Sequence, residues 1–290
     1  MVQTKERRPG PEEIPGQQLP YPASQADMAL APDSDLSNYK AAGKLEGKVA
    51  IITGGDSGIG RAVAIAYAME GAHVAITYNV NDEDAQKTKS LVEKRGGQCL
   101  PIKMDVRKPE DCENAIQQTV DKFGKLNILI NNAAFQMVRK DITELTIKQF
   151  HETFETNIFG YFHMFKAAFP HLNGGDAIIN TGSIVGKIGK EFLVDYAASK
   201  GAVHTFTKSL AQALAEKKIR VNSVVPGPVW TPNIPSTMTK DQVEEFDSDN
   251  AMGRAGQPEE LAPSYVFLAS EDSSFITGIL LDVTGGQLSN

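Results

Sequence analysis

Cysteine is nearly absent from this sequence, since Cys99 and Cys112 are the two in 290 residues. Two cysteines provide no disulfide framework, and neither has a Cys or His neighbour at a spacing typical of metal sites. Structural disulfides are rare in the cytosol, where thiols stay reduced. We therefore expect two reduced thiols, no metal and a cytoplasmic protein.

Long hydrophobic runs and an excess of positive charge are missing as well. No stretch approaches the roughly 20 apolar residues of a membrane span. Met1–Pro9 is polar and lacks the apolar segment of a secretory signal. The formal net charge of -7 argues against nucleic acid as the main partner. We expect neither a membrane nor a nucleic acid to be a partner.

The composition is that of a chain with a substantial core, with 41% hydrophobic and 22% charged residues. Residues 1–44 differ from the rest because they are rich in proline and have few apolar residues at any period. We predict an extended N-terminal arm over 1–44 and a single domain over 45–290. Two alternatives stay open for the arm: a disordered lead-in, or an arm that packs over its own domain or a neighbouring subunit. In the second case the contacts would come from Leu19, Tyr21, Met28 and Leu30.

Short apolar runs alternate with helical patterns from residue 48 onward. Strands are expected at 49–52, 74–78, 99–104, 126–130, 177–180, 219–224 and 279–282. Helices are expected at 58–70, 83–95, 109–123, 146–171, 195–217 and 258–269. This alternation favours right-handed crossovers and a parallel sheet covered on both faces. The predicted fold class is therefore α/β, a doubly wound Rossmann fold with a seven-stranded parallel sheet.

A glycine-rich turn, Thr53–Arg61, follows the first strand and opens the first helix. Its glycines are Gly54, Gly58 and Gly60. Glycine lets the backbone turn tightly and approach a phosphate closely, and the helix that follows directs its free N–H groups at that phosphate. A purely structural turn is the alternative, but this context is the one that indicates dinucleotide binding. No Gly-Lys-Ser/Thr triplet follows the turn, so a mononucleotide P-loop is disfavoured.

The cofactor's ribose 2′ position is less clearly specified. An acidic residue about twenty positions after the glycines would bind a free 2′ hydroxyl, but the second strand ends in Tyr78-Asn79. The following stretch 82–84 is acidic and would repel a 2′-phosphate that it faces, while Arg61 is the nearest cation that could attract one. The sequence slightly favours NAD over NADP.

Tyr196 and Lys200 are four residues apart in a predicted helix, and Ser183 precedes the tyrosine by thirteen residues. The four-residue spacing places both side chains on one helix face. A neighbouring ammonium favours the phenolate, so we expect Lys200 to lower the tyrosine pKa from its ordinary value of about 10. Such a phenol could serve as a general acid or base near neutral pH. By itself the pair could equally be an exposed helical pair.

Together, the glycine turn, Asn131-Asn132-Ala133-Ala134, Ser183 and the Tyr196/Lys200 pair resemble the short-chain dehydrogenase/reductase family. The resemblance covers residues 45–290, and the arm with Asp56-Ser57 is similar to a bacterial subgroup of stress-associated and sugar- or aldehyde-active oxidoreductases. It implies that Ser183 binds the substrate oxygen and Tyr196 exchanges the proton. Lys200 would tune the tyrosine and bind the nicotinamide ribose, and Asn157 would hold a water in a proton relay. The family usually has glycine where this chain has Ala134, whose methyl group narrows the space beside the cofactor.

The resemblance also assigns cofactor contacts along the whole predicted cleft. Asp105 would contact the adenine amino group, and Pro226-Gly227 and Thr231 the nicotinamide end. The full implied set is Gly54, Asp56, Ser57, Gly58, Ile59, Gly60, Tyr78, Asn79, Asp105, Val106, Asn132, Ala133, Ala134, Tyr196, Lys200, Pro226, Gly227, Val229 and Thr231. It further implies a homo-oligomer, usually a tetramer.

The activity this predicts is hydride transfer between NAD or NADP and a small alcohol or carbonyl substrate, such as an aldehyde, ketone, polyol or sugar. A non-catalytic dinucleotide sensor or scaffold is the alternative, since fold alone would permit it. A sugar-nucleotide epimerase or dehydratase is a third possibility, but the longer C-terminal domain and G-x-x-G-x-x-G turn usual in those relatives are missing. Residues 227–255 interrupt the alternation and suggest a lid or binding loop. Expected substrate-pocket side chains are Phe135, Gln136, Val185, Lys187, Lys190, Phe192 and Trp230.

Overall fold

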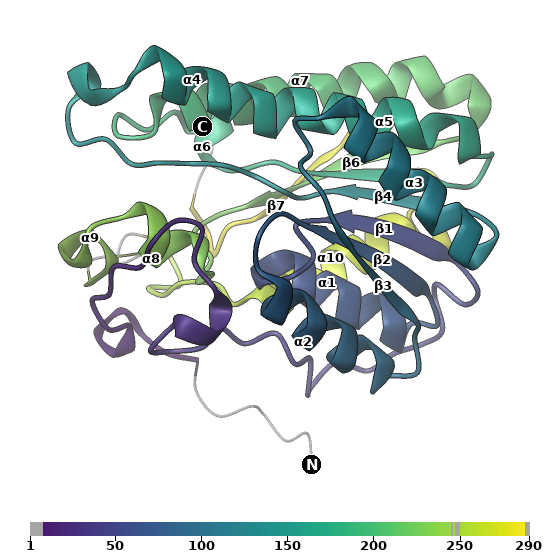
Figure 1. Ribbon diagram of the computed structural model, residues 1–290, viewed down its shortest axis with the longest axis horizontal. Coiled ribbons are helices and arrows are strands. Elements are labelled where there is room, and N and C mark those ends of the chain that lie inside the picture. Colours follow the sequence, from purple (N-terminus) through teal and green to yellow (C-terminus); the bar gives the residue numbers. More distant parts are fainter. Residues whose placement is uncertain (1–7, 245, 247–249, 288–290) are drawn as a thin grey trace.

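The computed structural model describes residues 8–244, 246 and 250–287, and its centre is one parallel β-sheet (Figure 1). The strands are β1 Val49–Thr53, β2 His73–Tyr78, β3 Cys99–Lys103, β4 Ile128–Asn131, β5 Ala177–Thr181, β6 Arg220–Pro226 and β7 Leu280–Val283. Their order is β3-β2-β1-β4-β5-β6-β7, and every neighbouring pair is parallel. The predicted seven-stranded doubly wound α/β fold is confirmed.

Helices cover both faces of the sheet, as Figure 1 shows. One face carries α1 Gly58–Met69, α2 Asp82–Glu93 and α10 Pro258–Ala269; the other carries α3 Pro109–Phe123, α5 Gly160–Ala168 and α7 Val194–Leu214. Successive strand residues point to opposite faces. Ile52 accordingly packs in the core beneath α1 and α10, and Ile51 in the core beneath α3 and α5. A strand buried on both faces must be continuously apolar, which explains the runs in the sequence.

The helix expected over 146–171 is continuous but changes its winding. It consists of α4 Ile147–Phe154, a π-helical turn Glu155–Phe159, α5 and a 3-10 turn Phe169–His171. A π turn accommodates one extra residue and often occurs at functional sites. Residue periodicity does not reveal it, because the apolar positions on either side remain helical.

The expected irregular stretch 227–255 contains two short helices in its described part, α8 Asn233–Thr237 and α9 Lys240–Glu244. Residues 245 and 247–249 of this stretch lie outside the described residues. The arm lies beside these helices in Figure 1. Ile14 and Met28 of the arm share a buried cluster with Trp230, Ile234 and Val243. We name this the arm cluster.

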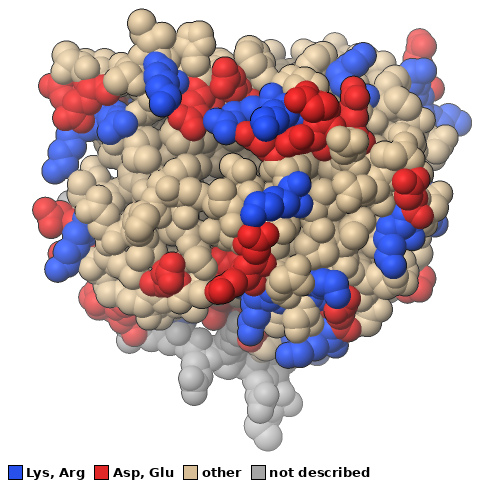
Figure 2. All heavy atoms as spheres, viewed as in Figure 1, with Lys and Arg blue, Asp and Glu red and all other residues tan. Residues whose placement is uncertain are grey.

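Charges of both signs are mixed on the face of the molecule drawn in Figure 2. On the face drawn in Figure 2, Lys and Arg side chains lie next to Asp and Glu, with no broad area of one sign. Within the described ranges, no helix has both the length and the apolar character needed to cross a bilayer. The same ranges hold no group of three or more His, Cys, Asp or Glu side chains arranged to bind a metal ion.

Candidate active site

A cavity of about 910 Å³ opens at the carboxyl edge of the sheet. The chain reverses its direction of strand addition between β1 and β4, and ligands of open α/β sheets bind outside the carboxyl ends at such a switch point. Of the predicted site residues, Gly60 and Asn157 lie behind the wall. The others line the cavity: Gly54, Asp56, Ser57, Gly58, Ile59, Tyr78, Asn79, Asp105, Val106, Asn132, Ala133, Ala134, Ser183, Tyr196, Lys200, Pro226, Gly227, Val229 and Thr231.

The glycine turn is locked by its own backbone and by β4. Gly54 and Gly58 have φ of 61° and 51°, a region that side chains with a Cβ rarely adopt. At Gly60 a Cβ would lie 2.1 Å from Gly54 O, so the helix packs directly against the turn. Asn132 Nδ2 donates to Thr53 O (3.0 Å) and Gly54 O (3.1 Å). These contacts hold the turn open toward the cavity, where Ile59 at the start of α1 forms part of the wall.

Arg61, expected to be the cation nearest a 2′-phosphate, does not face the cavity. It is buried, and its guanidinium donates to Asp84 Oδ1 (2.8 Å), Asp56 O (2.7 Å) and Thr88 Oγ1 (2.9 Å). A buried guanidinium needs these partners, because an unpaired charge there would be costly. Burial raises the pKa of Asp56 to about 6, with Asp84 adding to the rise and Arg61 opposing it.

The ribose end of the cavity is less acidic than the sequence suggested. Tyr78 donates its hydroxyl to Asp82 Oδ1 (2.8 Å), and Lys103 Nζ lies 2.8 Å from Asp82 Oδ2. Asp84 is buried against Arg61. Two of the three acidic groups expected to repel a 2′-phosphate are therefore paired, which weakens the reason for favouring NAD. Asn79 and Asn81 line this end of the cavity instead.

Arg107 is a cavity residue that the sequence reasoning missed. Its guanidinium donates to both carboxylate oxygens of Asp105 (2.7–3.0 Å) and to Glu152 Oε1 (3.3 Å). Burial alone would raise the pKa of Asp105, but the hydrogen bonds from Arg107 outweigh it and lower that pKa. A cation two residues beyond Asp105, at the cofactor edge of the sheet, was the available signal. Asp105 thus carries a paired carboxylate at the position expected to contact adenine.

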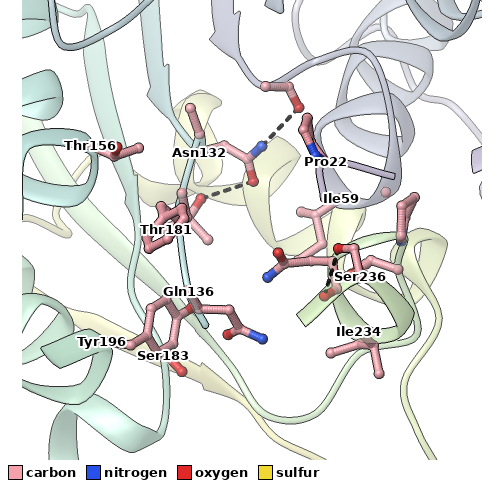
Figure 3. Close-up of a pocket in the computed structure, with 18 of the residues that line it drawn as sticks. Pro22, Ile59, Asn132, Gln136, Thr156, Thr181, Ser183, Tyr196, Ile234 and Ser236 are labelled. Atoms are coloured by element: carbon pink, nitrogen blue, oxygen red, sulfur yellow. Dashed lines mark hydrogen bonds between the residues drawn. The ribbon is translucent and has the colours of Figure 1, made fainter. Parts of the chain in front are cut away.

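Ser183, Tyr196 and Lys200 converge on one wall of the cavity, and Figure 3 shows the Tyr196 ring beside Ser183. Ser183 follows β5, and the other two residues lie one turn apart on α7. Ser183 interacts with the Tyr196 phenol and opposes the rise in its pKa. Lys200 is fully buried, with Nζ donating to Thr181 O (2.7 Å) and Tyr161 OH (3.3 Å). An exposed helical pair, the simpler explanation of the spacing, does not describe this arrangement.

The prediction that Lys200 lowers the pKa of Tyr196 is wrong for this structure. Burial raises the pKa of Tyr196 to about 12, and the hydrogen bond from Ser183 opposes the rise only in part. Burial also lowers the pKa of Lys200 to about 7. Desolvation disfavours the charged form of each group and is the largest cause of both shifts.

Asn157 sits in the π-helical turn and is fully buried. Its Oδ1 accepts from Phe135 N (2.7 Å), and its Nδ2 donates to Phe135 O (2.9 Å) and Ser199 Oγ (2.9 Å). The side chain thereby joins the loop after β4 to helix α7 near Tyr196. Its water-holding role remains a prediction.

His204 is a second residue that the sequence reasoning missed. It is buried on α7, and Ser183 N donates to its Nε2 at 3.4 Å. A Cβ at Gly182 would lie 2.5 Å from the same nitrogen. Burial, with Lys200 nearby, lowers the pKa of His204 to about 4, which keeps the ring neutral and able to accept. One turn beyond Lys200 on the same helix was the available signal.

The substrate end differs from the predicted set at two residues. Phe135, Gln136, Val185, Lys190 and Phe192 line the cavity as expected. Trp230 does not, because it is fully buried in the arm cluster and donates Nε1–H to Leu30 O (2.9 Å). Lys187 forms an ion pair with Asp282 instead. Helix α8 provides Ile234 and Ser236, which Figure 3 places across the cavity from Tyr196.

Comparison with known families gives a match over most of the chain. A family model described as enoyl-(acyl carrier protein) reductase matches residues 54–287, which include the glycine turn and every catalytic candidate.

Individual relatives match along nearly their full length. General stress protein 39 of Bacillus subtilis (strain 168) is 49% identical over 278 residues, covering 96% of this chain and 97% of the relative. The NADPH-dependent aldehyde reductase 1, chloroplastic, of Arabidopsis thaliana is 44% identical over 276 residues, covering 93% and 96%. The crystal structure of a short chain dehydrogenase from Burkholderia cenocepacia J2315 in complex with NADP superposes with a TM-score of 0.79 at 32% identity, covering 84% of this chain and 98% of that one.

Proposed function

The chain belongs to the short-chain dehydrogenase/reductase family of oxidoreductases, as predicted, and on that basis we propose that it transfers a hydride between a nicotinamide dinucleotide and an alcohol or carbonyl substrate, with Tyr196 as the general acid and base. The observation that carries the proposal is that the Ser183 and Tyr196 side chains lie side by side on the cavity wall (Figure 3). Two hydroxyls facing one point can bind and polarise a single oxygen atom. A non-catalytic sensor would not require this pair.

The cavity fits a dinucleotide on its own geometry. Its volume, the positive-φ glycine turn and the start of α1 together provide a phosphate site at a helix N-terminus. The turn would hold the phosphates, and Asp105 and Asn79 would face the adenosine half. When bound, the dinucleotide supplies or accepts the hydride. We propose NAD or NADP as the cofactor. The NADP-bound relative and the NADPH-dependent relative support the phosphorylated form.

The protein's own steps concern one oxygen and one proton. In reduction, Ser183 donates a hydrogen bond to the carbonyl oxygen and Tyr196 donates its phenolic proton to it. In oxidation, the phenolate accepts the alcohol proton. Lys200 lies behind the tyrosine, and its hydrogen bonds to Thr181 O and Tyr161 OH fix the lysine side chain there. Orientation contributes beside acid–base catalysis, because well-placed reactants avoid the entropy cost of meeting.

The substrate we propose is a small aldehyde, ketone, polyol or sugar. The cavity wall at this end mixes aromatic Phe135 and Phe192 with the amide of Gln136 and the ammonium of Lys190. Apolar faces bind the carbon skeleton, and the polar groups bind further oxygens. The name of the aldehyde reductase relative supports the same substrate class.

We further propose a cytoplasmic homotetramer. Ile147, Phe159 and Phe162 on the α4–α5 segment are 80%, 51% and 46% exposed in the single chain. Large exposed apolar side chains on one segment favour an interface between subunits. Light scattering of the purified protein tests the mass.

The activity is tested by following the oxidation of NADH and NADPH with a panel of aldehydes, ketones and sugars, and the reverse reaction with polyols. The Tyr196→Phe variant should lose at least about 10²–10⁴-fold in turnover, while its dinucleotide affinity stays close to that of the parent. Tyr39→Phe is the control, because the Tyr39 hydroxyl bonds Glu70 outside the cavity. A Tyr196→Phe variant that keeps most of its turnover would disprove the assignment.

A further inference from the structure

A short segment of the N-terminal arm, Tyr21–Gln25, crosses the candidate cofactor cavity, and we name it the strap. Tyr21, Pro22 and Ala23 line the same cavity as the glycine turn and Tyr196. Figure 3 shows Pro22 beside Ile59, at the far side of the cavity from Thr156 and Tyr196.

The strap is attached on both sides of the glycine turn. On one side Asn81 Nδ2 donates to Ala23 O at 2.9 Å. On the other, the Tyr21 ring packs edge-on against Phe135 with centroids 5.3 Å apart. Asn81 follows β2 and Phe135 follows β4, and β1 lies between those strands in the sheet. The strap therefore passes over the end of β1, where the glycine turn begins.

The strap is also fixed directly to the turn and its helix. Gln25 is buried, and its Oε1 accepts the amide of Gly58 at 2.9 Å. Asp84 Oδ2 accepts from Ser24 Oγ (2.7 Å) and from Gln25 N (2.7 Å), while its other oxygen binds Arg61. Buried hydrogen bonds to a charged group are among the stronger ones in proteins. The buried Arg61–Asp84 pair thus anchors the strap to α1 and α2.

These contacts leave the cavity itself open beneath the strap. Gln25 takes the Gly58 amide, whereas Ile59, the next residue of α1, lines the cavity. A dinucleotide with its adenosine half near Asn79 and Asp105 and its other half near Tyr196 would run below Tyr21–Ala23. Its phosphates would then lie between the glycine turn and the strap. An apolar cover there excludes water and strengthens the attraction between phosphate and helix N-terminus.

We propose that the strap is the outer wall of the dinucleotide site and that the cofactor leaves only when the strap detaches. The inference rests on the proposed function, because it assumes that a dinucleotide binds in this cavity. It assigns binding roles to Tyr21 and Gln25, which lie outside the 54–287 region matched by the family model. The strap slows release and adds contact area to the bound cofactor.

The test measures the dissociation rates of NADPH and NADH by stopped-flow fluorescence of the reduced nucleotide. An excess of the non-fluorescent oxidised nucleotide displaces it. The double variant Tyr21→Ala/Gln25→Ala removes the aromatic contact and the Gly58 hydrogen bond. We expect its dissociation rate to rise about five- to fiftyfold, which corresponds to the loss of one buried hydrogen bond and one ring contact. The matched control is Tyr39→Ala/Gln17→Ala, because these two arm residues do not line the cavity.

An unchanged or slower dissociation rate in the strap variant overturns the inference, as does an equal increase in the control. Failure of the parent protein to bind either nucleotide would instead refute the proposed function. Circular dichroism and melting temperature establish that the variant is folded. Amide hydrogen exchange gives a second measurement: saturating nucleotide should slow exchange at residues 21 and 23–25. Faster exchange there would mean that the cofactor displaces the strap, which also overturns the inference.

Discussion

The Lys200 Nζ atom lies 5.6 Å from the centroid of the Tyr196 ring and donates its hydrogen bonds elsewhere, to Thr181 O and Tyr161 OH. The ammonium is thus behind the phenol and not on its hydroxyl. Both groups are buried, so the protein without a ligand favours their neutral forms. This relationship determines the pH behaviour of the site and of the fold.

The rates of the two reaction directions should depend differently on pH. Reduction needs the protonated phenol, and with a Tyr196 pKa of about 12 this form persists across the working range. The reduction kcat/KM should therefore vary little between about pH 6 and 9, while oxidation should rise nearly tenfold per pH unit. Initial rates in both directions, in buffers of constant ionic strength, check this. An oxidation rate that levels off near pH 7 would mean that Lys200 does lower the tyrosine pKa in the working enzyme.

Replacing Lys200 with methionine should stabilise the fold in a pH-dependent way. The folded-state pKa of about 7 is below the ordinary 10.5, so between these values the unfolded chain binds the extra proton. Stability therefore rises with pH in this window, and the burial penalty is greatest at pH 7 and below. We expect Lys200→Met to raise the melting temperature by at least about 2 °C at pH 7, with a smaller gain at pH 10. Thr181 O keeps its bond from Tyr161 OH in the variant.

The control for that measurement is Lys208→Met, an exposed position on the same helix. Its melting temperature should follow that of the parent at both pH values. A Lys200→Met gain that does not shrink on going from pH 7 to 10 would show that the lysine titrates normally in the fold.

Gly60→Ala should damage the phosphate end of the cavity. The added Cβ would lie 2.1 Å from Gly54 O and 2.9 Å from Asn132 Nδ2, so the turn must move. Overpacking of this kind costs about 1–3 kcal/mol, and dinucleotide affinity should fall at least about tenfold because the turn loses its shape. Isothermal titration calorimetry and thermal melts measure both. Gly256→Ala is the control, since its Cβ would meet neighbours at 3.5 Å or more; equal effects of the two changes would contradict the geometry.

Trp230→Phe should affect stability and leave the substrate end unchanged. The indole is fully buried against the arm, and its removal loses the hydrogen bond to Leu30 O and part of the packing. A loss of about 1–3 kcal/mol in unfolding free energy is expected, with KM for the carbonyl substrate within about twofold of the parent. Phe192→Ala is the contrasting variant, because Phe192 lines the cavity; its KM should rise. If Trp230→Phe raises KM instead, the tryptophan belongs to the pocket.

The fold and the catalytic wall could be predicted from the sequence because both follow from local patterns. Period and order of the apolar runs specify a parallel sheet, and short-range spacing places Tyr196 beside Lys200 on α7. The residues that follow the strands of a parallel sheet all lie at its carboxyl edge. The glycine turn, Asp105 and Ser183 could therefore be assigned to one cavity from the sequence alone.

Long-range partners were not accessible in the same way. The direction of the Arg61 guanidinium depends on Asp84 and Thr88, from a different helix, and the burial of Trp230 depends on an arm two hundred residues earlier. Lys187 pairs with Asp282 by a similar tertiary contact. The pKa of Tyr196 also depends on how deeply the side chain is buried, and a helical spacing does not predict that burial. The sequence therefore assigned Arg61, Lys187 and Trp230 to the cavity, whereas in the fold their side chains bind tertiary partners outside it.

The arm is synthesised first, yet several of its partners are among the last residues to be made. Leu30 binds Trp230, and Arg8 binds Glu259, a separation of 251 residues. On the ribosome, Ile14 and Met28 would stay exposed until Trp230, Ile234 and Val243 have emerged. The strap's own partners, from Gly58 to Phe135, emerge earlier. The chain order thus makes docking of the arm cluster a late step, and a protein truncated near residue 225 would leave Ile14 and Met28 without the residues that cover them.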